Sequence, residues 1–285
     1  MKKFSYYPGC PSTTHAIDQE LSTKAVFEKL EIELIEMEDW NCCGALEAED
    51  PMLVYALNAR NLAIAEKDGL DIATPCSICF YNLERTNEAL KDEKLRAKMR
   101  EIDASLDYKG NVKARHTLDI IVNEIGLEEL SKKIEKKVNV KVAPYYGCYI
   151  GRPSRLGFDD PDDPESMDRL IELIGGEVIP FAPMKTKCCG GPLMMTRSDI
   201  AFEMTRKILE AAKEKGADCV ITACPLCHMM LDAKQPDIEE SLNIKLEVPV
   251  LYFVQLLGLA LGIPAKKLAI DKNIVDAKSI VEKVV

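Results

Sequence analysis

The amino-acid sequence predicts an α/β protein with two similar halves, each built on a parallel sheet with cysteines at the carboxyl ends of its strands. Two observations predict this fold class. A cysteine pattern occurs twice, and each of its elements follows a segment with the composition of a strand. Amphipathic helical segments separate these strands, and such an alternation is typical of a parallel sheet covered by helices.

The repeated pattern consists of a single cysteine, an adjacent pair followed by glycine, and a Cys-x-x-Cys. The first copy contains Cys10, Cys42, Cys43, Cys76 and Cys79, and the second contains Cys148, Cys188, Cys189, Cys224 and Cys227. The remaining cysteine, Cys219, lies in a predicted strand and is expected to be a small buried apolar residue. The repeat predicts two domains, residues 1–141 and 142–285.

Strands are expected at 2–7, 32–37 and 70–74 in the first half, and at 140–146, 177–181 and 217–222 in the second. Helices are expected at 15–30, 50–67, 77–90, 164–174 and 198–215. Asp50-Pro51 has the chemistry of a helix start, and Gly69 of a helix stop. Segment 91–141 is highly charged and is expected to form a helical linker or insertion, including a helix at 116–125, or alternatively a docking surface.

Composition excludes several classes of protein. The 285 residues are 47% apolar, which suffices for two cores, and the net charge of −10 argues against a nucleic-acid binder of the basic-patch kind. No apolar signal segment precedes the first cysteine, so eleven cysteines indicate a reducing compartment and a cytoplasmic location. The apolar run 248–263 is shorter than the roughly 20 residues of a membrane span, and it predicts a buried or partner-facing helix without stable membrane insertion.

In parallel α/β sheets, ligands bind beyond the carboxyl ends of the strands. Because the cysteine elements of each half all follow predicted strands, they can converge at one end of the sheet. Zinc sites and simple iron–sulfur clusters use four ligands, whereas each half offers five thiolates. Adjacent cysteines, with Cα atoms about 3.8 Å apart, can bind different irons of one polynuclear centre, and Gly44 would allow that centre to approach the backbone.

Other interpretations stay open at this point. A redox-active dithiol or a zinc site in one or both halves is the alternative to a multi-iron centre. His228 follows Cys227 directly and is expected to pack rather than to support the site, and His15 and His116 are expected to be surface or core residues. The chain lacks the ferredoxin cysteine run, so a separate electron-delivering partner is expected.

The doubled cysteine frame resembles the B subunit of heterodisulfide reductase from methanogens and related anaerobes, which contains a pair of cysteine-rich CCG domains. The resemblance extends from Tyr6 to the segment 248–262. It implies two pseudo-repeated, Rossmann-like CCG domains, each holding a noncubane 4Fe-4S cluster on the five cysteines of its half. Those ten cysteines would be catalytic through the clusters they bind.

The resemblance also implies a substrate and partners. The substrate would be the mixed disulfide of coenzyme M and coenzyme B, cleaved to two thiols. Electrons would come from the C subunit of heterodisulfide reductase, fed by its flavin-bearing A subunit, and through them from a hydrogenase or formate dehydrogenase. We expect four basic residues near the second cysteine pair either to bind acidic substrate groups or to be ordinary surface charges. They are Arg152, Arg155, Lys185 and Lys187.

Two other functions remain as alternatives. CCG domains also occur in iron–sulfur subunits of quinone-linked succinate or fumarate reductases and of lactate or glycolate oxidation systems. The apolar run 248–263 is the feature that favours this alternative. A zinc-bound, non-catalytic scaffold is the other.

Overall fold

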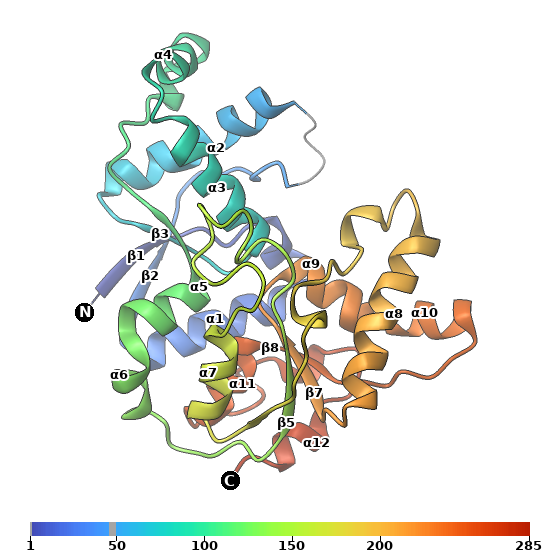
Figure 1. Cartoon of the computed structure of the whole chain (residues 1–285). Helices are drawn as coiled ribbons and strands as arrows, with labels where there is room; N and C mark the ends of the chain where they lie inside the picture. The colour runs from blue at the N-terminus through green and yellow to red at the C-terminus, as the bar shows by residue number, and fades with distance from the viewer. Residues whose placement is uncertain (1, 46–49) are drawn as a thin grey trace.

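The computed structural model describes residues 2–45 and 50–285, and it confirms the α/β class. In this part of the chain there are two four-stranded sheets, ordered β2-β1-β3-β4 and β6-β5-β7-β8, and all their pairings are parallel (Figure 1). The strands of the first sheet are β1 (Lys2–Tyr6), β2 (Ile32–Glu36), β3 (Ile72–Thr74) and β4 (Ala114–His116). Those of the second are β5 (Lys141–Tyr145), β6 (Glu177–Val178), β7 (Cys219–Thr222) and β8 (Val250–Tyr252).

Helices follow the strands in both halves. In the first half they are α1 (Ile17–Lys29), α2 (Pro51–Asp68), α3 (Ser77–Ala89), α4 (Glu93–Ile102), α5 (Thr117–Asp119) and α6 (Leu127–Ser131). In the second they are α7 (Ser166–Leu173), α8 (Ser198–Glu214), α9 (Pro225–His228), α10 (Gln235–Leu242), α11 (Phe253–Ala260) and α12 (Lys278–Glu282). Single π-helical turns at Ile120–Gly126 and Met229–Ala233 continue α5 and α9.

The start and stop signals of α2 are those expected from the sequence. The Asp50 side chain accepts a hydrogen bond from the Met52 amide, and Pro51 occupies the first turn. Gly69 ends the helix with a φ of 67°, a left-handed conformation that glycine adopts without strain.

Both sheets contain a fourth strand that the sequence did not predict. Segment 248–263 was expected to be a helix, but it begins with β8 and becomes helical only at Phe253. Likewise β4 was not expected before the helix at 116–125, which itself forms as α5 and its π-helical continuation, with His116 both ending β4 and capping the helix. The expected strand at 177–181 extends only over Glu177–Val178. These strands are two or three residues long, too short for an alternating pattern to distinguish them from their neighbours.

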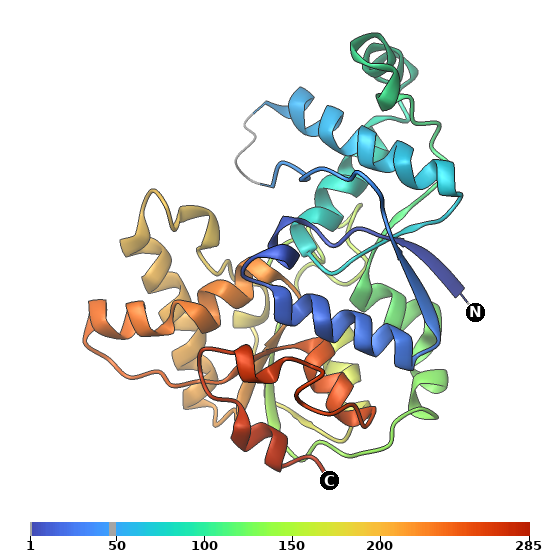
Figure 2. The same cartoon turned by 180° about the vertical axis from the view of Figure 1, so that it is seen from behind.

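The two halves share their cores. Helix α1 packs against α11, and α5 and α6 pack against α7, so helices of both halves lie between the sheets (Figures 1 and 2). One cluster of buried side chains includes Leu118 from the first half with Ile171 and Phe253 from the second. Helix α4 projects from the upper end of the molecule in Figure 1. Buried apolar side chains of both halves therefore hold the two sheets, and the cysteines at their strand ends, together.

Helix α11 is buried along its whole length, which confirms the expectation that the apolar run is internal. None of the helices in the described ranges has both the length and the apolar composition needed to cross a bilayer.

Two carboxyl groups, those of Asp18 and Asp232, are buried in the described structure. The Asp232 carboxylate accepts hydrogen bonds from the Ile274 and Val275 amides at 2.7 and 3.1 Å and thereby fixes the C-terminal segment. Asp18 is buried on α1. Burial raises the pKa of each group from 3.8 to about 6.

We expect Asp18→Asn to stabilise the protein at high pH. The folded state binds the Asp18 proton more tightly than the unfolded state does, because its pKa is raised to about 6. The resulting contribution to the free energy of unfolding is fully present below about pH 4 and is lost as the pH rises through about 6. The variant should match the wild type near pH 4 and exceed its free energy of unfolding by up to about 3 kcal/mol at pH 8. Chemical denaturation at both pH values measures this, and a difference that does not change with pH would contradict it.

Candidate redox site with ten cysteines

The structure brings the five cysteines of each half together beyond the carboxyl ends of its strands. Cys10 follows β1, the pair Cys42-Cys43 follows β2, and Cys76 follows β3, with Cys79 in the first turn of α3. The second half repeats this placement with β5, β6, β7 and α9. All of these thiols are free, as is Cys219, which is fully buried in β7 as expected.

In the first half the thiols approach in pairs. The Cys42 Sγ lies 3.7 Å from the Cys10 Sγ, and the Cys43 Sγ lies 3.5 Å from the Cys79 Sγ. Interaction with Cys10 lowers the pKa of Cys42 to about 2, whereas interaction with Cys42 raises the pKa of Cys43 to about 11. One thiolate among protonated neighbours is therefore the favoured state of the group alone.

The second half has the same electrostatic pattern. Interaction with Cys148 lowers the pKa of Cys188 to about 2, and interaction with Cys188 raises the pKa of Cys189 to about 12. Burial and neighbouring thiols raise the pKa of every remaining cysteine of the two groups except Cys224. A multiply charged cationic centre would relieve this repulsion and allow all five thiolates to form.

The two cysteine groups meet at the boundary between the halves. Interaction with the Cys224 thiol is the largest cause that raises the pKa of Cys76, and Cys224, whose pKa is lowered, interacts with both Cys227 and Cys76. The Cys-x-x-Cys of each half therefore lies beside that of the other half. This contact is not visible in the sequence, because it depends on how the two sheets pack.

A buried tyrosine supports the cysteine pair of each half. The Tyr7 hydroxyl donates to the carbonyl of Asn41 at 2.8 Å, and the Tyr145 hydroxyl donates to the carbonyl of Lys187 at 2.6 Å. Each carbonyl belongs to the residue directly before a cysteine pair. The tyrosines precede Cys10 and Cys148 by three residues, so each hydrogen bond links the single cysteine's loop to the pair's loop.

Helix side chains hold the same loops from behind. The Asn58 amide donates to the Cys43 carbonyl at 2.9 Å, and the Thr205 hydroxyl donates to the Cys189 carbonyl at 2.7 Å. In the first half, the Asn82 amide also donates to the Ala45 carbonyl at 3.1 Å. In the sequence, the signal for these contacts is a polar residue on the apolar face of each helix, Asn58 on α2 and Thr205 on α8.

Backbone amides point at the sulfurs of the pairs. The Ala45 amide lies 3.4 Å from the Cys43 Sγ, and the Gly190 and Gly191 amides lie at the same distance from the Cys188 and Cys189 Sγ atoms. Hydrogen bonds of this kind stabilise thiolates and tune the potential of bound iron–sulfur centres.

The glycine before each single cysteine has a steric role. A Cβ on Gly9 would lie 3.1 Å from the Cys79 Sγ, and one on Gly147 would lie 3.2 Å from the Cys227 Sγ. Both glycines also have positive φ angles, of 77° and 71°. The glycine after the second cysteine pair has a different role, because a Cβ on Gly190 would meet the Ala201 backbone of α8 at 2.8 Å.

His116 and His228 are buried near the cysteines, and their side chains bond or stack with neighbouring residues. His116 Nδ1 accepts from the Leu118 amide at 3.1 Å, so its Nε2 carries the proton and donates to the Ala223 carbonyl at 3.2 Å. Burial lowers the pKa of both His116 and His228 to about 4. The His228 ring stacks on Tyr252 at 4.0 Å, while His15 is exposed. His116 thus joins β4 of the first half to the residue preceding Cys224.

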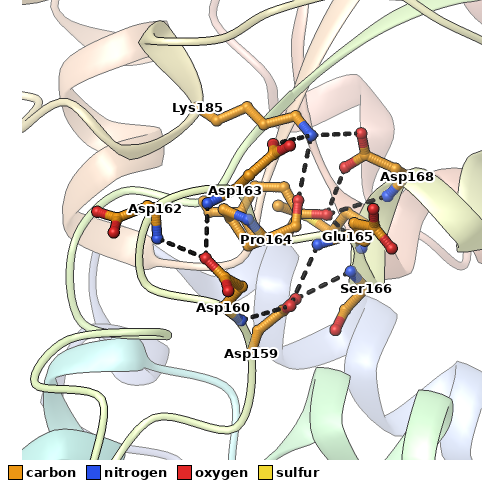
Figure 3. Close-up of polar contacts among 11 residues, drawn as sticks. Asp159, Asp160, Asp162, Asp163, Pro164, Glu165, Ser166, Asp168 and Lys185 are labelled. Carbon is orange, nitrogen blue, oxygen red and sulfur yellow. Dashed lines mark hydrogen bonds and ion pairs between the residues drawn. The ribbon is translucent and has the colours of Figure 1, made fainter.

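Lys185 organises the loop behind Cys148 (Figure 3). Its ammonium group lies 2.6 Å from an Asp168 carboxylate oxygen and 3.0 Å from an Asp163 oxygen, and it donates to the Pro164 carbonyl. Its own carbonyl accepts the amides of Tyr146 and Gly147. The ammonium group is thus neutralised by protein carboxylates and fixes the path of the chain into Cys148.

The other three basic residues near the second cysteine pair are exposed. Arg152 donates to the Pro161 carbonyl at 2.9 Å and pairs with Asp162 at 3.3 Å, so it stiffens its own loop. Arg155 and Lys187 expose their side chains, and Lys187 directly precedes Cys188.

A narrow cavity opens onto the second cysteine group and is lined by both halves. Ser77 and Ile78 come from the first half, and Tyr149, Pro192 and Leu226 from the second. Larger hollows lie elsewhere on the surface, for example beside Lys2 and Glu129, but contain no cysteine. The cysteines that line this small cavity therefore identify the candidate site, whereas cavity volume does not.

The donor set fits a centre with several metal ions. Within residues 2–45 and 50–285, no three side chains of His, Cys, Asp or Glu converge on the position of one ion. The thiols instead approach in pairs, with the glycines and amides described above around them. Five soft sulfur donors in this arrangement suit iron–sulfur chemistry.

Several known proteins are similar to this chain over nearly its whole length. A protein 38% identical over 97% of this chain and 98% of its own length is the 8-methylmenaquinol:fumarate reductase membrane anchor subunit of Wolinella succinogenes. The B subunit of the ferredoxin:CoB-CoM heterodisulfide reductase of Methanosarcina mazei is 31% identical over 96% of this chain and 94% of its own length. A protein of Archaeoglobus profundus that is named as similar to the heterodisulfide reductase B subunit is also 31% identical, over 94% of both chains.

A solved structure shares the fold. The crystal structure of a hypothetical protein from Helicobacter pylori superimposes with a TM-score of 0.80 at 14% identity, over 97% of this chain. This chain spans about half of that protein, 52% of its length. The model of the CCG cysteine-rich domain matches residues 4–84 and 142–232. The chain therefore belongs to the CCG cysteine-rich domain family, and it carries two copies of the domain.

Proposed function

We propose that this chain is the catalytic iron–sulfur subunit of a reductase that cleaves a small disulfide into two thiols. The observation that carries the proposal is the meeting of the two five-cysteine groups: Ser77 and Ile78, which directly follow Cys76, line one cavity together with Cys224 and Cys227. Cys10, Cys42, Cys43, Cys76 and Cys79 would hold one noncubane 4Fe-4S cluster, and Cys148, Cys188, Cys189, Cys224 and Cys227 the other.

The stoichiometry of the reaction suits paired centres. Cleaving a disulfide consumes two electrons and two protons and yields two thiols. When bound, each cluster supplies one-electron transfer. The chain's residues hold the two groups in contact, so that both sulfurs of one substrate lie within reach. The cavity beside the second group has apolar walls at Ile78 and Leu226, and a bound substrate would displace water from it.

The finer assignment follows the relatives that are named heterodisulfide reductase subunits. The substrate would be the coenzyme M–coenzyme B disulfide, and the C and A subunits of heterodisulfide reductase would deliver electrons from a hydrogenase or formate dehydrogenase. Of the basic residues considered for substrate binding, Arg155 and Lys187 suit that role best. The Lys185 ammonium group is held by two carboxylates, and Arg152 by its own loop.

A second candidate function is electron transfer between a quinol and fumarate or succinate. The 38% identical Wolinella protein favours it, because its name assigns it to an 8-methylmenaquinol:fumarate reductase. The buried position of α11 removes the sequence feature that had favoured this function. The same cysteine groups would serve either reaction, so activity must distinguish them.

We expect the protein, prepared without oxygen, to oxidise a reduced viologen with the heterodisulfide as acceptor and to release two thiols per disulfide. Cys76→Ala should lower the rate by roughly 100-fold or more, since even changes around a metal ligand cost up to that factor. Cys219→Ala is the matched control and should retain the rate, because Cys219 lies outside both groups.

Oxidation of a menaquinol analogue, with no reaction of the disulfide, would overturn the disulfide reductase and select the second candidate. Equal losses in the Cys76 and Cys219 variants would remove Cys76 from the site.

We expect Tyr145→Phe to reduce the free energy of unfolding by about 1 kcal/mol, because it removes a buried hydrogen bond to Lys187. Tyr252→Phe is a matched control, since the buried Tyr252 hydroxyl has no hydrogen-bond partner in the described structure. Denaturation of both variants measures the difference. A loss in Tyr252→Phe as large as that in Tyr145→Phe would show that the Tyr145 hydrogen bond contributes nothing specific.

A further inference from the structure

Helix α3 serves both cysteine groups. Its Cys79 belongs to the first group, and its Ile78 lines the cavity of the second. One turn further, Tyr81 stacks on Tyr149, with ring centroids 4.6 Å apart and an angle of 30° between the rings. Tyr149 directly follows Cys148 and also lines the cavity. The face of α3 that carries Ile78 and Tyr81 therefore leads outward from the second cysteine group.

Arg85 is the next residue on that face, four positions after Tyr81. Its guanidinium carbon lies 5.5 Å from the Tyr81 ring centroid and 5.7 Å from that of Tyr55. Its Nε is buried and has no hydrogen-bond partner among the described residues. An N–H group excluded from water without an acceptor is unfavourable, so its presence needs an explanation.

The acidic neighbours of Arg85 on α3 are engaged elsewhere. Glu84 accepts from the Ala114 amide at 2.6 Å, and Glu88 pairs with Lys91. Across the described chain, no carboxylate forms an ion pair with Arg85. The aromatic rings thus hold the guanidinium in place without neutralising it.

This arrangement suits an oxyanion. A guanidinium presents a planar fork of donors that matches a carboxylate, sulfonate or phosphate, and aromatic contacts fix its plane in advance. Arg85 lies seven positions after Ile78, which is about 10 Å along a helix. The cation therefore lies at a defined distance from the cavity beside the cysteines.

We propose that Arg85, with Tyr81 and Tyr149, binds an oxyanion on the molecule that reacts at the cysteine groups, about 10 Å along α3 from the cavity lined by Ile78. The inference rests on the proposed disulfide reduction and adds a requirement on its substrate. Substrates with an acidic group at that distance are preferred over uncharged ones and over those with a much closer acid. The four basic residues near the second cysteine pair are not part of this site.

The test compares disulfides under viologen-driven reduction. The probes are the disulfides of 8-mercaptooctanoate, 8-mercaptooctanol and 3-mercaptopropionate. Arg85→Gln should lower the preference in kcat/KM for the octanoate over the octanol disulfide by about 10- to 100-fold, through KM, as expected for a lost charge-assisted contact. Arg85→Lys should restore part of it. Arg100→Gln, which removes an exposed guanidinium paired with Glu93, should leave the preference unchanged.

Binding without reaction separates this site from the reaction itself. Calorimetry with octanoate and octanol should show that octanoate binds more tightly, and that Arg85→Gln removes the difference. If octanoate binding depends on Arg85 while none of the disulfides is reduced, the anion site stands and the proposed reaction fails. If the disulfides are reduced and Arg85→Gln leaves the ratio of kcat/KM between the octanoate and octanol disulfides unchanged, the anion site is overturned. If Arg85→Gln lowered kcat/KM for the propionate disulfide as much as for the octanoate disulfide, the proposed spacing between the anion and the cysteine groups would be wrong.

Discussion

Mutual repulsion among crowded thiolates is the constraint on which the rest of the site depends. Neighbouring thiols stabilise Cys42 in the first half, and Cys188 and Cys224 in the second, as thiolates, whereas the other cysteines of the two groups hold their protons more tightly than a free cysteine. A five-thiolate site is therefore stable only with a compensating cationic centre. The buried tyrosine, the helix side chain and the backbone amides behind each cysteine pair keep the thiols in position for one.

The two halves position their cysteine loops with different side chains. The first half uses asparagines on α2 and α3, and the second uses Thr205 and a long loop fixed by Lys185. The cavity and the Tyr81–Tyr149 stack lie on the side of the second group. Chemically different groups on the two sides suit a ligand with two different ends. Because helices of both halves form shared cores, the groups are not free to move apart.

Much of this organisation could be predicted from the sequence, and the failures have physical causes. The repeat and the strand-end positions of the ten cysteines follow from local pattern. Strands β4 and β8 were missed because three residues are too few for a pattern, and β8 runs directly into the apolar helix α11. The contact of Cys76 with Cys224 and the pairing of Lys185 with Asp163 and Asp168 depend on tertiary packing. The environment of Arg85 was missed for the same reason, since its rings come from α2 and α3.

Metal content tests the central claim most directly. The protein should be purified without oxygen, and its iron, acid-labile sulfide and zinc should be measured per chain. Two four-iron centres predict about eight irons with matching sulfide and little zinc. Zinc with little iron would contradict the redox site and leave a structural module. About four irons with zinc would mean one centre, and reduction of a disulfide between two centres would have to be abandoned.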